Sequence, residues 1–264
     1  MTLSPTPFDD VYKTLCVTCP TLILPLLNEA FGTADTGNEQ IEQEETEHHF
    51  TEADGTQRKR ISDNVFTVTK GNDVKRYIFE CESNPDGSIL VRFFEYALLS
   101  GLANQTLENN TLTIPLPHVA VLFLRSAKTS SSTMTVRIRL PDGSESRMII
   151  PIIRLHNYTI PDLFRKKLYI LFPFSLFLYE KKFAIIEKDD QLLHQFTNEI
   201  TGAMHQLLNI NNEELNDYQK SVLRTMFMIV LQQFGQKHET ILKGVQKSMG
   251  GHVIDLPETC PASL

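Results

Sequence analysis

The sequence of 264 residues predicts an α/β domain followed by a helical C-terminal region. Up to about residue 188, short segments with the alternating or continuous apolar pattern of strands are interleaved with segments of helical periodicity. From Asp190 onward the apolar residues follow only the helical period, and no internal repeat of about 20 to 50 residues is visible. We therefore expect an α/β domain over residues 1–188 and a helical region over residues 189–264.

The first part of the chain predicts a helix and three strands. Apolar residues at helical spacing indicate helical turns on both sides of Cys19-Pro20, which end near Gly32. The turn Gly71-Asn72-Asp73 joins the last two strands as a hairpin, and the polar stretch 51–60 before them is expected to be a loop. The three strands are expected over Ile41–Phe50, Ile61–Thr69 and Val74–Cys81.

The middle of the chain returns from helix to strand. Ser88 can cap a helix over Ile89–Ala103, whose apolar residues share one side. The short apolar run Ala120–Leu124 is typical of a buried strand. Two further strands, Met134–Leu140 and Arg147–Leu155, are expected to form a hairpin around Pro141-Asp142-Gly143.

Helical patterns occupy the rest of the chain. Thr159 can cap a helix that has Pro161 near its first turn. The apolar run Leu168–Tyr179 contains Pro173 and is shorter than the ~20 residues that span a bilayer, so we expect a buried or partly amphipathic helix pair. Further helices are expected over Leu192–Leu208, over Glu213–Phe234 with Asn211 or Asn212 as its cap, and over His238–Met249. An apolar stripe in this region would serve either the core or oligomerisation; it consists of Leu215, Val222, Met226 and Ile229.

Composition limits the class of protein. Apolar residues make up 41% of the chain and charged residues 22%, as in ordinary soluble globular proteins, which excludes collagen-like, low-complexity and wholly disordered chains. The formal charge of −7 argues against a protein that coats its whole surface with nucleic acid, but it leaves room for a local basic groove. Four cysteines are too few for a disulfide framework, and the N-terminus lacks the pattern of a secretory signal. We expect a cytoplasmic protein with no membrane segment.

Three carboxylates are expected to converge on the predicted hairpin. Glu80 and Glu82 are two residues apart and share a face of their strand, and Asp63 on the preceding strand can meet them across the ladder. Such carboxylates repel one another unless a cation lies between them, and their oxygens suit Mg²⁺ or Mn²⁺. A bound ion of this kind can polarise a phosphoryl oxygen and activate a water. The alternative is that each is a solvated strand residue.

Longer stretches of the sequence carry a family resemblance. The runs YKTLCVTCPTLILPLLNEAFG, ISDNVFTV and RYIFECESNPDGSILVRFFEYALL resemble the PD-(D/E)XK nuclease family transposases, also called the recombination-promoting nuclease (Rpn) family. The resemblance continues through PHVAVLFLRS and YTIPDLFRKKLYILFPFSLFLYE, and so covers about two thirds of the chain. It implies a restriction-endonuclease-like core in the order helix, three strands, helix, strand. It also implies Mg²⁺-dependent cleavage of DNA, linked to recombination or transposition.

The resemblance assigns roles to individual residues. Asp63 matches the aspartate of the PD half-motif, although Ser62 stands in place of the proline. Glu80 matches the metal-binding acidic residue, and Glu29 matches an acidic residue that many members hold in the first helix. Glu82 occupies the position of the catalytic lysine, which in this family is commonly glutamine. The implied metal ligands are thus Asp63, Glu80 and Glu29, and the implied catalytic residues are Asp63, Glu80 and Glu82.

A glutamate at the lysine position leaves two functions open. A lysine would orient the attacking water, whereas Glu82 repels the phosphate unless it becomes a further metal ligand. Arg92, which with Tyr96 matches the family's R-x-F-E-Y segment, could supply the missing positive charge; alternatively it pairs with Glu95 or with Glu82 itself. The chain is therefore expected to be a metal-dependent DNA endonuclease or, in the alternative, a catalytically impaired DNA-binding or assembly protein.

Basic residues near the carboxylates could hold DNA. One cluster precedes the Asp63 strand and another surrounds the hairpin turn, and both could contact phosphates while the net charge stays negative. The alternative is ordinary solvated surface. The residues expected to bind DNA are Arg58, Lys59, Arg60, Lys75 and Arg92, with Lys70 and Arg76 nearby.

Overall fold

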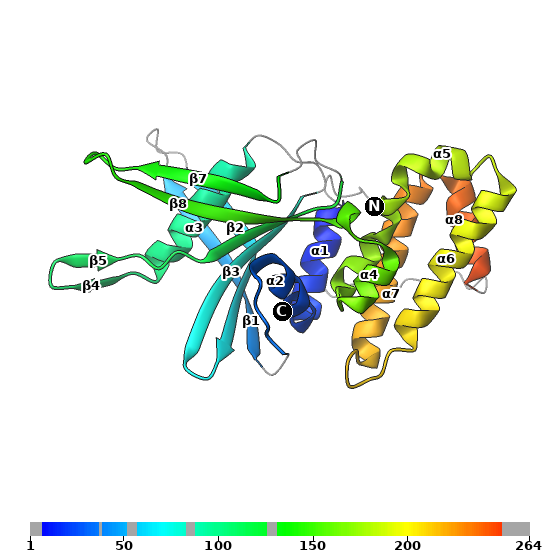
Figure 1. Cartoon of the computed structure of the whole chain (residues 1–264), viewed down its shortest axis with the longest axis horizontal. Coiled ribbons are helices and arrows are strands. Elements are labelled where there is room, and N and C mark those ends of the chain that lie inside the picture. Colours follow the sequence, from blue (N-terminus) through cyan, green and yellow to red (C-terminus); the bar gives the residue numbers. More distant parts are fainter. Residues whose placement is uncertain (1–6, 37–38, 52–56, 83–87, 126–130, 250–264) are drawn as a thin grey trace. The chain divides into compact units, whose positions relative to one another are not determined.

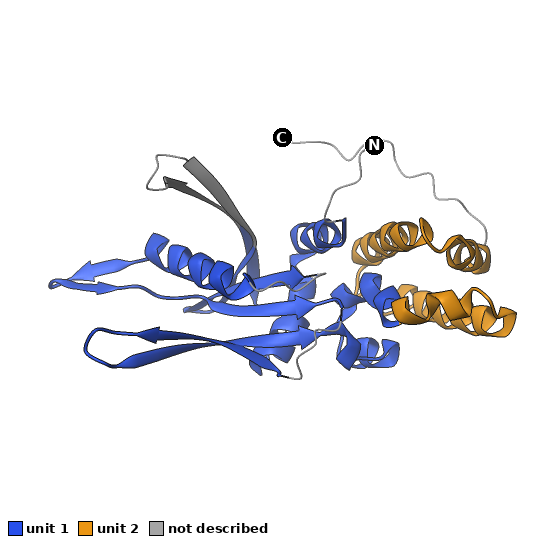
Figure 2. Ribbon diagram, turned by 90° about the horizontal axis from the view of Figure 1, so that it is seen from above, with its two compact units in different colours: residues 1–178 blue, residues 179–264 orange. Residues whose placement is uncertain are grey.

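The computed structural model describes residues 7–36, 39–51, 57–82, 88–125 and 131–249, and gives only the backbone for residues 45–51 and 57–63. The chain divides into two compact units, residues 1–178 and residues 179–264 (Figure 2). The first unit contains both helices and strands, and the described part of the second contains helices alone. The predicted α/β fold class is confirmed at this level.

A six-stranded mixed sheet forms the centre of the first unit, in the order β1-β2-β3-β6-β8-β7 (Figure 1). Strands β3, β6 and β8 run parallel, and the other neighbouring strands are antiparallel. The strands of this sheet span Gln40–Thr51 (β1), Gln57–Lys70 (β2), Asp73–Glu82 (β3), His118–Phe123 (β6), Thr133–Arg139 (β7) and Glu145–Arg154 (β8).

A separate small hairpin follows the third helix and was not predicted. Its strands, Thr106–Glu108 (β4) and Thr111–Thr113 (β5), have three residues each, which is too short to show an alternating pattern. Asn109 and Asn110 form its turn with positive φ angles of 49° and 62°, a conformation that asparagine tolerates better than most residues.

Helices cover both faces of the sheet. The helices of this unit are α1 (Pro7–Thr18), α2 (Leu24–Phe31), α3 (Ile89–Ala103) and α4 (Ile160–Arg165), with 3₁₀ segments η1 (Pro20–Ile23), η2 (Leu155–Asn157) and η3 (Tyr169–Leu178). On one face, the Tyr12 hydroxyl of α1 donates to the carbonyl of Phe79 at 3.5 Å, and the ring of Phe31 in α2 lies 5.3 Å from that of Tyr77. On the other face, Phe93 of α3 packs in an apolar cluster with sheet residues.

Side chains of β3 therefore alternate between two helical layers. Tyr77 and Phe79 contact α2 and α1, whereas Ile78 belongs to the apolar cluster around α3. Because successive side chains of a strand point to opposite faces, Glu80 and Glu82 lie on the α3 side of the sheet. The predicted common face of these two glutamates follows from this alternation.

Several predicted boundaries are confirmed. Helix α3 covers the expected Ile89–Ala103, and Gly32 ends α2 with a φ of 65°, which only glycine adopts at no cost. Thr159 caps α4 by accepting a hydrogen bond from the backbone N–H of Asp162 at 3.3 Å.

Two expectations for the first unit are wrong. The stretch 51–60 was expected to be a loop, but β2 begins at Gln57 and includes Arg58, Lys59 and Arg60, because this part pairs with β1 along its whole length. The expected helix pair over Leu168–Tyr179 is one buried 3₁₀ segment, η3, with Pro173 inside it. Proline has no N–H and collides with the preceding turn of an α-helix, so a 3₁₀ path suits this segment better.

No single helix among the described residues is long and apolar enough to cross a membrane. The bent pair formed by Pro7–Thr18 and Pro20–Phe31 passes that test only by length and composition.

In the second unit, the buried side of α7 is not the predicted apolar stripe. Asn216, not Asn211 or Asn212, caps α7 and accepts from the backbone N–H of Gln219 at 2.9 Å. The core side of α7 is formed by Leu223, Phe227, Val230, Leu231 and Phe234, whereas Val222, Met226 and Ile229 are half-buried; Leu215, before the helix, is buried. The elements of this unit are η4 (Glu180–Lys182), α5 (Phe183–Ile186), α6 (Asp190–Leu208), α7 (Asp217–Gly235) and α8 (Glu239–Ser248).

Candidate functional site

Asp63 and Glu80 lie near the end of the ladder between β2 and β3. The ladder between the two strands ends at the pair Val65 and Ile78. Asp63 on β2 and Glu80 on β3 each lie two residues beyond this pair. The two residues predicted to be the metal pair therefore lie just past the paired part of the two strands.

Strand β2 is irregular at this point. Glu44 pairs with Val65 but Thr46 pairs with Ser62, so Asp63 and Asn64 together lie opposite a single residue of β1. Such a β-bulge bends its strand and redirects a side chain, and bulges are common beside active sites. Asn64 is 2% exposed, and its amide oxygen has no hydrogen-bond partner among the described residues. Val65 belongs to the apolar cluster around α3, so the neighbouring side chain of Asn64 lies on the other face of the sheet from Glu80.

Glu82 forms an ion pair with Arg92. The guanidinium Nη2 of Arg92, on α3, donates to Oε1 of Glu82, on β3. The Glu82 side chain is only 13% exposed and that of Arg92 is 33% exposed, so the pair is partly shielded from water. Of the partners that the sequence left open for Arg92, the structure shows Glu82. The negative charge of Glu82 is therefore balanced from the next helix.

Glu82 lies at the carboxyl end of the parallel strands. It pairs with Phe123 of β6, which in turn pairs with Arg154 of β8, so the three residues form one row across the sheet. Arg154 is 7% exposed and, like Glu82, lies on the α3 side of the sheet. The carboxyl ends of parallel strands are the usual place for ligands in such sheets. Arg154 was not expected from the sequence, although it is an arginine that directly follows the apolar run MIIPII.

Asp9 also lies near this end of β3 and was not expected there from the sequence. Burial raises the pKa of the Cys81 thiol well above its usual value, and the negative charge of Asp9 raises it further, as do those of Glu82 and Glu80. Cys81 is 6% exposed and lies between the two glutamates along β3. Asp9, in the first turn of α1, therefore adds to the negative potential around the end of β3.

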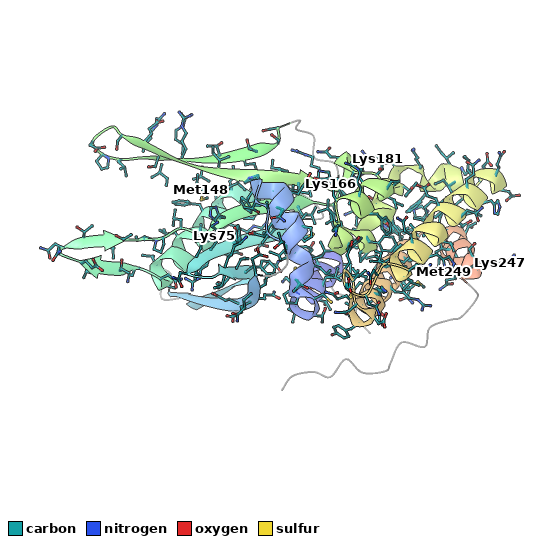
Figure 3. The ribbon with its side chains drawn as sticks, turned by 60° about the horizontal axis from the view of Figure 1, so that its bottom comes forward. Lys75, Met148, Lys166, Lys181, Lys247 and Met249 are labelled. Atoms are coloured by element: carbon teal, nitrogen blue, oxygen red, sulfur yellow. The ribbon has the colours of Figure 1, made fainter. Side chains whose placement is uncertain are left out.

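The carboxylate of Glu29 contacts Lys166 and Tyr158. Both of its carboxylate oxygens accept from Nζ of Lys166, at 2.8 and 2.7 Å, and Oε1 also accepts from the Tyr158 hydroxyl at 3.0 Å (Figure 3 labels Lys166). Burial raises the pKa of the Tyr158 phenol, and the hydrogen bond to Glu29 adds to this effect. The carboxylate of Glu29 is thus neutralised by a lysine from α4's C-terminal end.

The cations around the hairpin turn are paired with carboxylates. Lys75 lies 3.1 Å from Asp73, and Lys70 lies 3.0 Å from Glu39, whose side chain is buried. Hydrogen bonding to these carboxylates raises the pKa of both lysines. The first basic cluster, Arg58 to Arg60, pairs through its backbone with His48, His49 and Phe50 of β1, and its side chains lie outside the description.

Among the described side chains, which do not include that of Asp63, no group of three histidine, cysteine, aspartate or glutamate residues is close enough to hold a metal ion. Glu80 and Glu82 share a face and Glu82 contacts Arg92, whereas Glu29 contacts Lys166 and Tyr158.

Comparison of the chain with protein-family models, with curated proteins and with solved structures gives no match.

Proposed function

We propose that the chain is a Mg²⁺-dependent DNA endonuclease of the PD-(D/E)XK type, with Asp63 and Glu80 as its metal ligands. The observation that most supports this function is that Asp63, at a β-bulge, and Glu80 each lie two residues beyond the last pair of the β2–β3 ladder. The order of elements, with helices before three strands and then a helix and a strand, is also that of a restriction-endonuclease-like core. This order agrees with the family resemblance of the same stretches of sequence.

The donor groups suit a hard divalent cation. The carboxylates of Asp63 and Glu80 are oxygen ligands, the kind that Mg²⁺ and Mn²⁺ prefer. When bound, the ion would polarise a phosphodiester oxygen and lower the pKa of a water. Glu29 is left out of this ligand set because Lys166 and Tyr158 occupy its carboxylate.

The pair of Glu82 and Arg92 lessens the repulsion that a glutamate beside the site would exert on DNA. With its charge balanced by the guanidinium, Glu82 adds little net negative potential. The same pair favours the second candidate function, an inactive DNA-binding or assembly protein, because Arg92 is held by Glu82 and no lysine stands at that position.

Plasmid nicking tests the proposed function. Purified protein is incubated with supercoiled plasmid in Mg²⁺, Mn²⁺ or EDTA, and open-circular and linear products are counted. We expect cleavage with either metal and none in EDTA. If the protein binds DNA but does not nick it in either metal, the endonuclease function is rejected and the inactive DNA-binding function is retained.

Replacement of Glu82 separates the two candidate functions. In an endonuclease, Glu82→Gln should preserve or increase the Mg²⁺-dependent nicking rate, because a negative charge near the phosphate is lost and Arg92 is released from its ion pair. In an inactive binding protein, neither form cuts, but the variant should bind DNA more tightly. Glu108→Gln, an exposed change of the same charge on β4, is the control. Loss of nicking in Glu82→Gln would instead make Glu82 an essential ligand or base.

The basic cluster on β2 is tested through salt dependence. Changing Arg58, Lys59 and Arg60 together to alanine should weaken binding to every DNA sequence alike. If each residue contacts one phosphate, the slope of log K against log salt should fall by about 0.9 per contact. The measurement is a fluorescence-anisotropy titration in EDTA at several salt concentrations. An unchanged slope would mean that the cluster is solvated surface.

A further inference from the structure

Strands β7 and β8 form a two-stranded ribbon with one buried and one exposed face (Figure 1). Met134, Val136 and Met148 pack against the apolar cluster that contains α3, and Ile150 is fully buried in it (Figure 3 labels Met148). The alternate residues of the ribbon are exposed along both strands. The face of the ribbon that points away from α3 is therefore part of the solvent-exposed surface of this unit.

Arginine dominates this exposed face, which we call the arginine face. It consists of Thr135, Arg137 and Arg139 on β7 and Glu145, Arg147 and Ile149 on β8. Arg137 lies directly opposite Arg147, and Arg139 lies opposite Glu145. The face thus carries three positive charges against one negative charge, in a chain whose net charge is −7.

The single carboxylate serves two arginines. Nε of Arg139 donates to Oε1 of Glu145 at 2.8 Å, and Nε of Arg137 lies 3.6 Å from Oε2 of the same residue. Arg147 has no carboxylate partner in the part of the chain that the structure describes. Like charges directly opposite in a ladder destabilise it, so the pair of Arg137 and Arg147 has a cost that a bound anion would remove.

We propose that the arginine face binds the phosphate backbone of duplex DNA. Guanidinium groups match phosphate oxygens with two parallel hydrogen bonds, and a ladder of them presents several such groups to successive phosphates. The side chain of Arg139 is 74% exposed and that of Arg137 is 50% exposed, so both can reach a ligand. The choice of DNA as the polyanion rests on the proposed function; the charge of the face alone would also suit an acidic protein.

The arginine face is distinct from the proposed metal site and from the neighbouring Glu82. Arg147 precedes Arg154 by seven residues along β8, which corresponds to about 23 Å of strand. Arg154 lies in the row with Glu82 on the α3 side, whereas the arginine face looks away from α3. The two surfaces can therefore be changed independently.

The test is DNA binding by the full chain in EDTA, where no metal-dependent cleavage can occur. Anisotropy of a fluorescein-labelled duplex is titrated at several salt concentrations with the parent protein and with the triple variant Arg137→Gln, Arg139→Gln, Arg147→Gln. We expect the salt slope of the variant to fall by about 2.7, since each of three phosphate contacts contributes about 0.9. The control carries the same charge change on exposed lysines of the second unit, Lys181→Gln, Lys182→Gln and Lys188→Gln, and should keep the parent slope.

A single substitution is expected to change the affinity for DNA in the opposite direction. Glu145→Gln removes the only carboxylate of the arginine face and frees both arginines, so we expect it to bind the duplex several times more tightly than the parent. This variant tests the proposal even if the triple variant does not fold. An unchanged slope in a folded triple variant, or equal or weaker binding by Glu145→Gln, would overturn it. So would a polyglutamate competitor that displaces the duplex more effectively than unlabelled duplex does. Because binding is measured without metal, failure of plasmid nicking would not change these outcomes.

Discussion

Alanine at Glu80 is expected to abolish Mg²⁺-dependent nicking while the protein remains folded. Glu80 and Asp63 each lie two residues beyond the last β2–β3 pair, and Glu80 is half-buried on β3, so its carboxylate is the best-placed described oxygen donor of the proposed metal site. Loss of one preorganised group that stabilises the transition state costs about 10²- to 10³-fold in rate, and loss of a metal ligand should cost at least as much. Removing one of several neighbouring carboxylates also relieves repulsion, so stability should change little.

The measurement compares nicking rates of the parent, Glu80→Ala and Asp63→Ala in Mg²⁺, with circular dichroism to show that each variant is folded. Asp73→Ala is the matched control because it removes a carboxylate from the other end of β3. It should retain the parent rate. A folded Glu80→Ala protein that nicked plasmid as fast as the parent would reject the proposed site.

Phe93→Ala should lower the free energy of unfolding by about 3–5 kcal/mol, the usual cost of removing a large buried aromatic side chain. Phe93 is 0% exposed and lies in the cluster that joins α3 to the sheet, together with Ile78 and Val121. Its loss leaves a cavity between the two layers. The same helix carries Arg92, so the substitution also loosens the element that balances Glu82.

Urea denaturation of the parent and of the variant measures this change in the free energy of unfolding. Val91→Ala, on the same helix but 59% exposed, is the control and should change stability by less than about 0.5 kcal/mol. A loss below about 1 kcal/mol for Phe93→Ala would show that α3 does not pack on the sheet as described.

Local patterns predicted the elements that position the candidate site. The turn at Gly71-Asn72 sets the register of the hairpin, and a two-residue alternation places Glu80 and Glu82 on one face, so both could be derived by counting along the chain. Helix α3 was predicted to the residue because its apolar period is regular. Such features depend only on neighbours in the sequence.

The 3₁₀ path of η3 and the buried side of α7 could not be derived in this way. Both segments are so rich in apolar residues that several faces fit a core equally well, and packing against other elements decides which is buried. The β-bulge at Asp63 and Asn64 was also missed, because a bulge is defined by two strands and leaves no periodic signal in one of them.

The sequence by itself determined which carboxylates share a strand face; only the tertiary structure decided the partners of those carboxylates. Arg92, on α3, binds Glu82 at the end of β3, and Glu29 binds Lys166, which is 137 residues away in the sequence. A charged side chain can pair with any opposite charge that the fold brings within a few ångströms, and spacing along the chain does not restrict that choice. For this reason the amino-acid sequence predicted the common face of Glu80 and Glu82, yet left open how each charge is balanced.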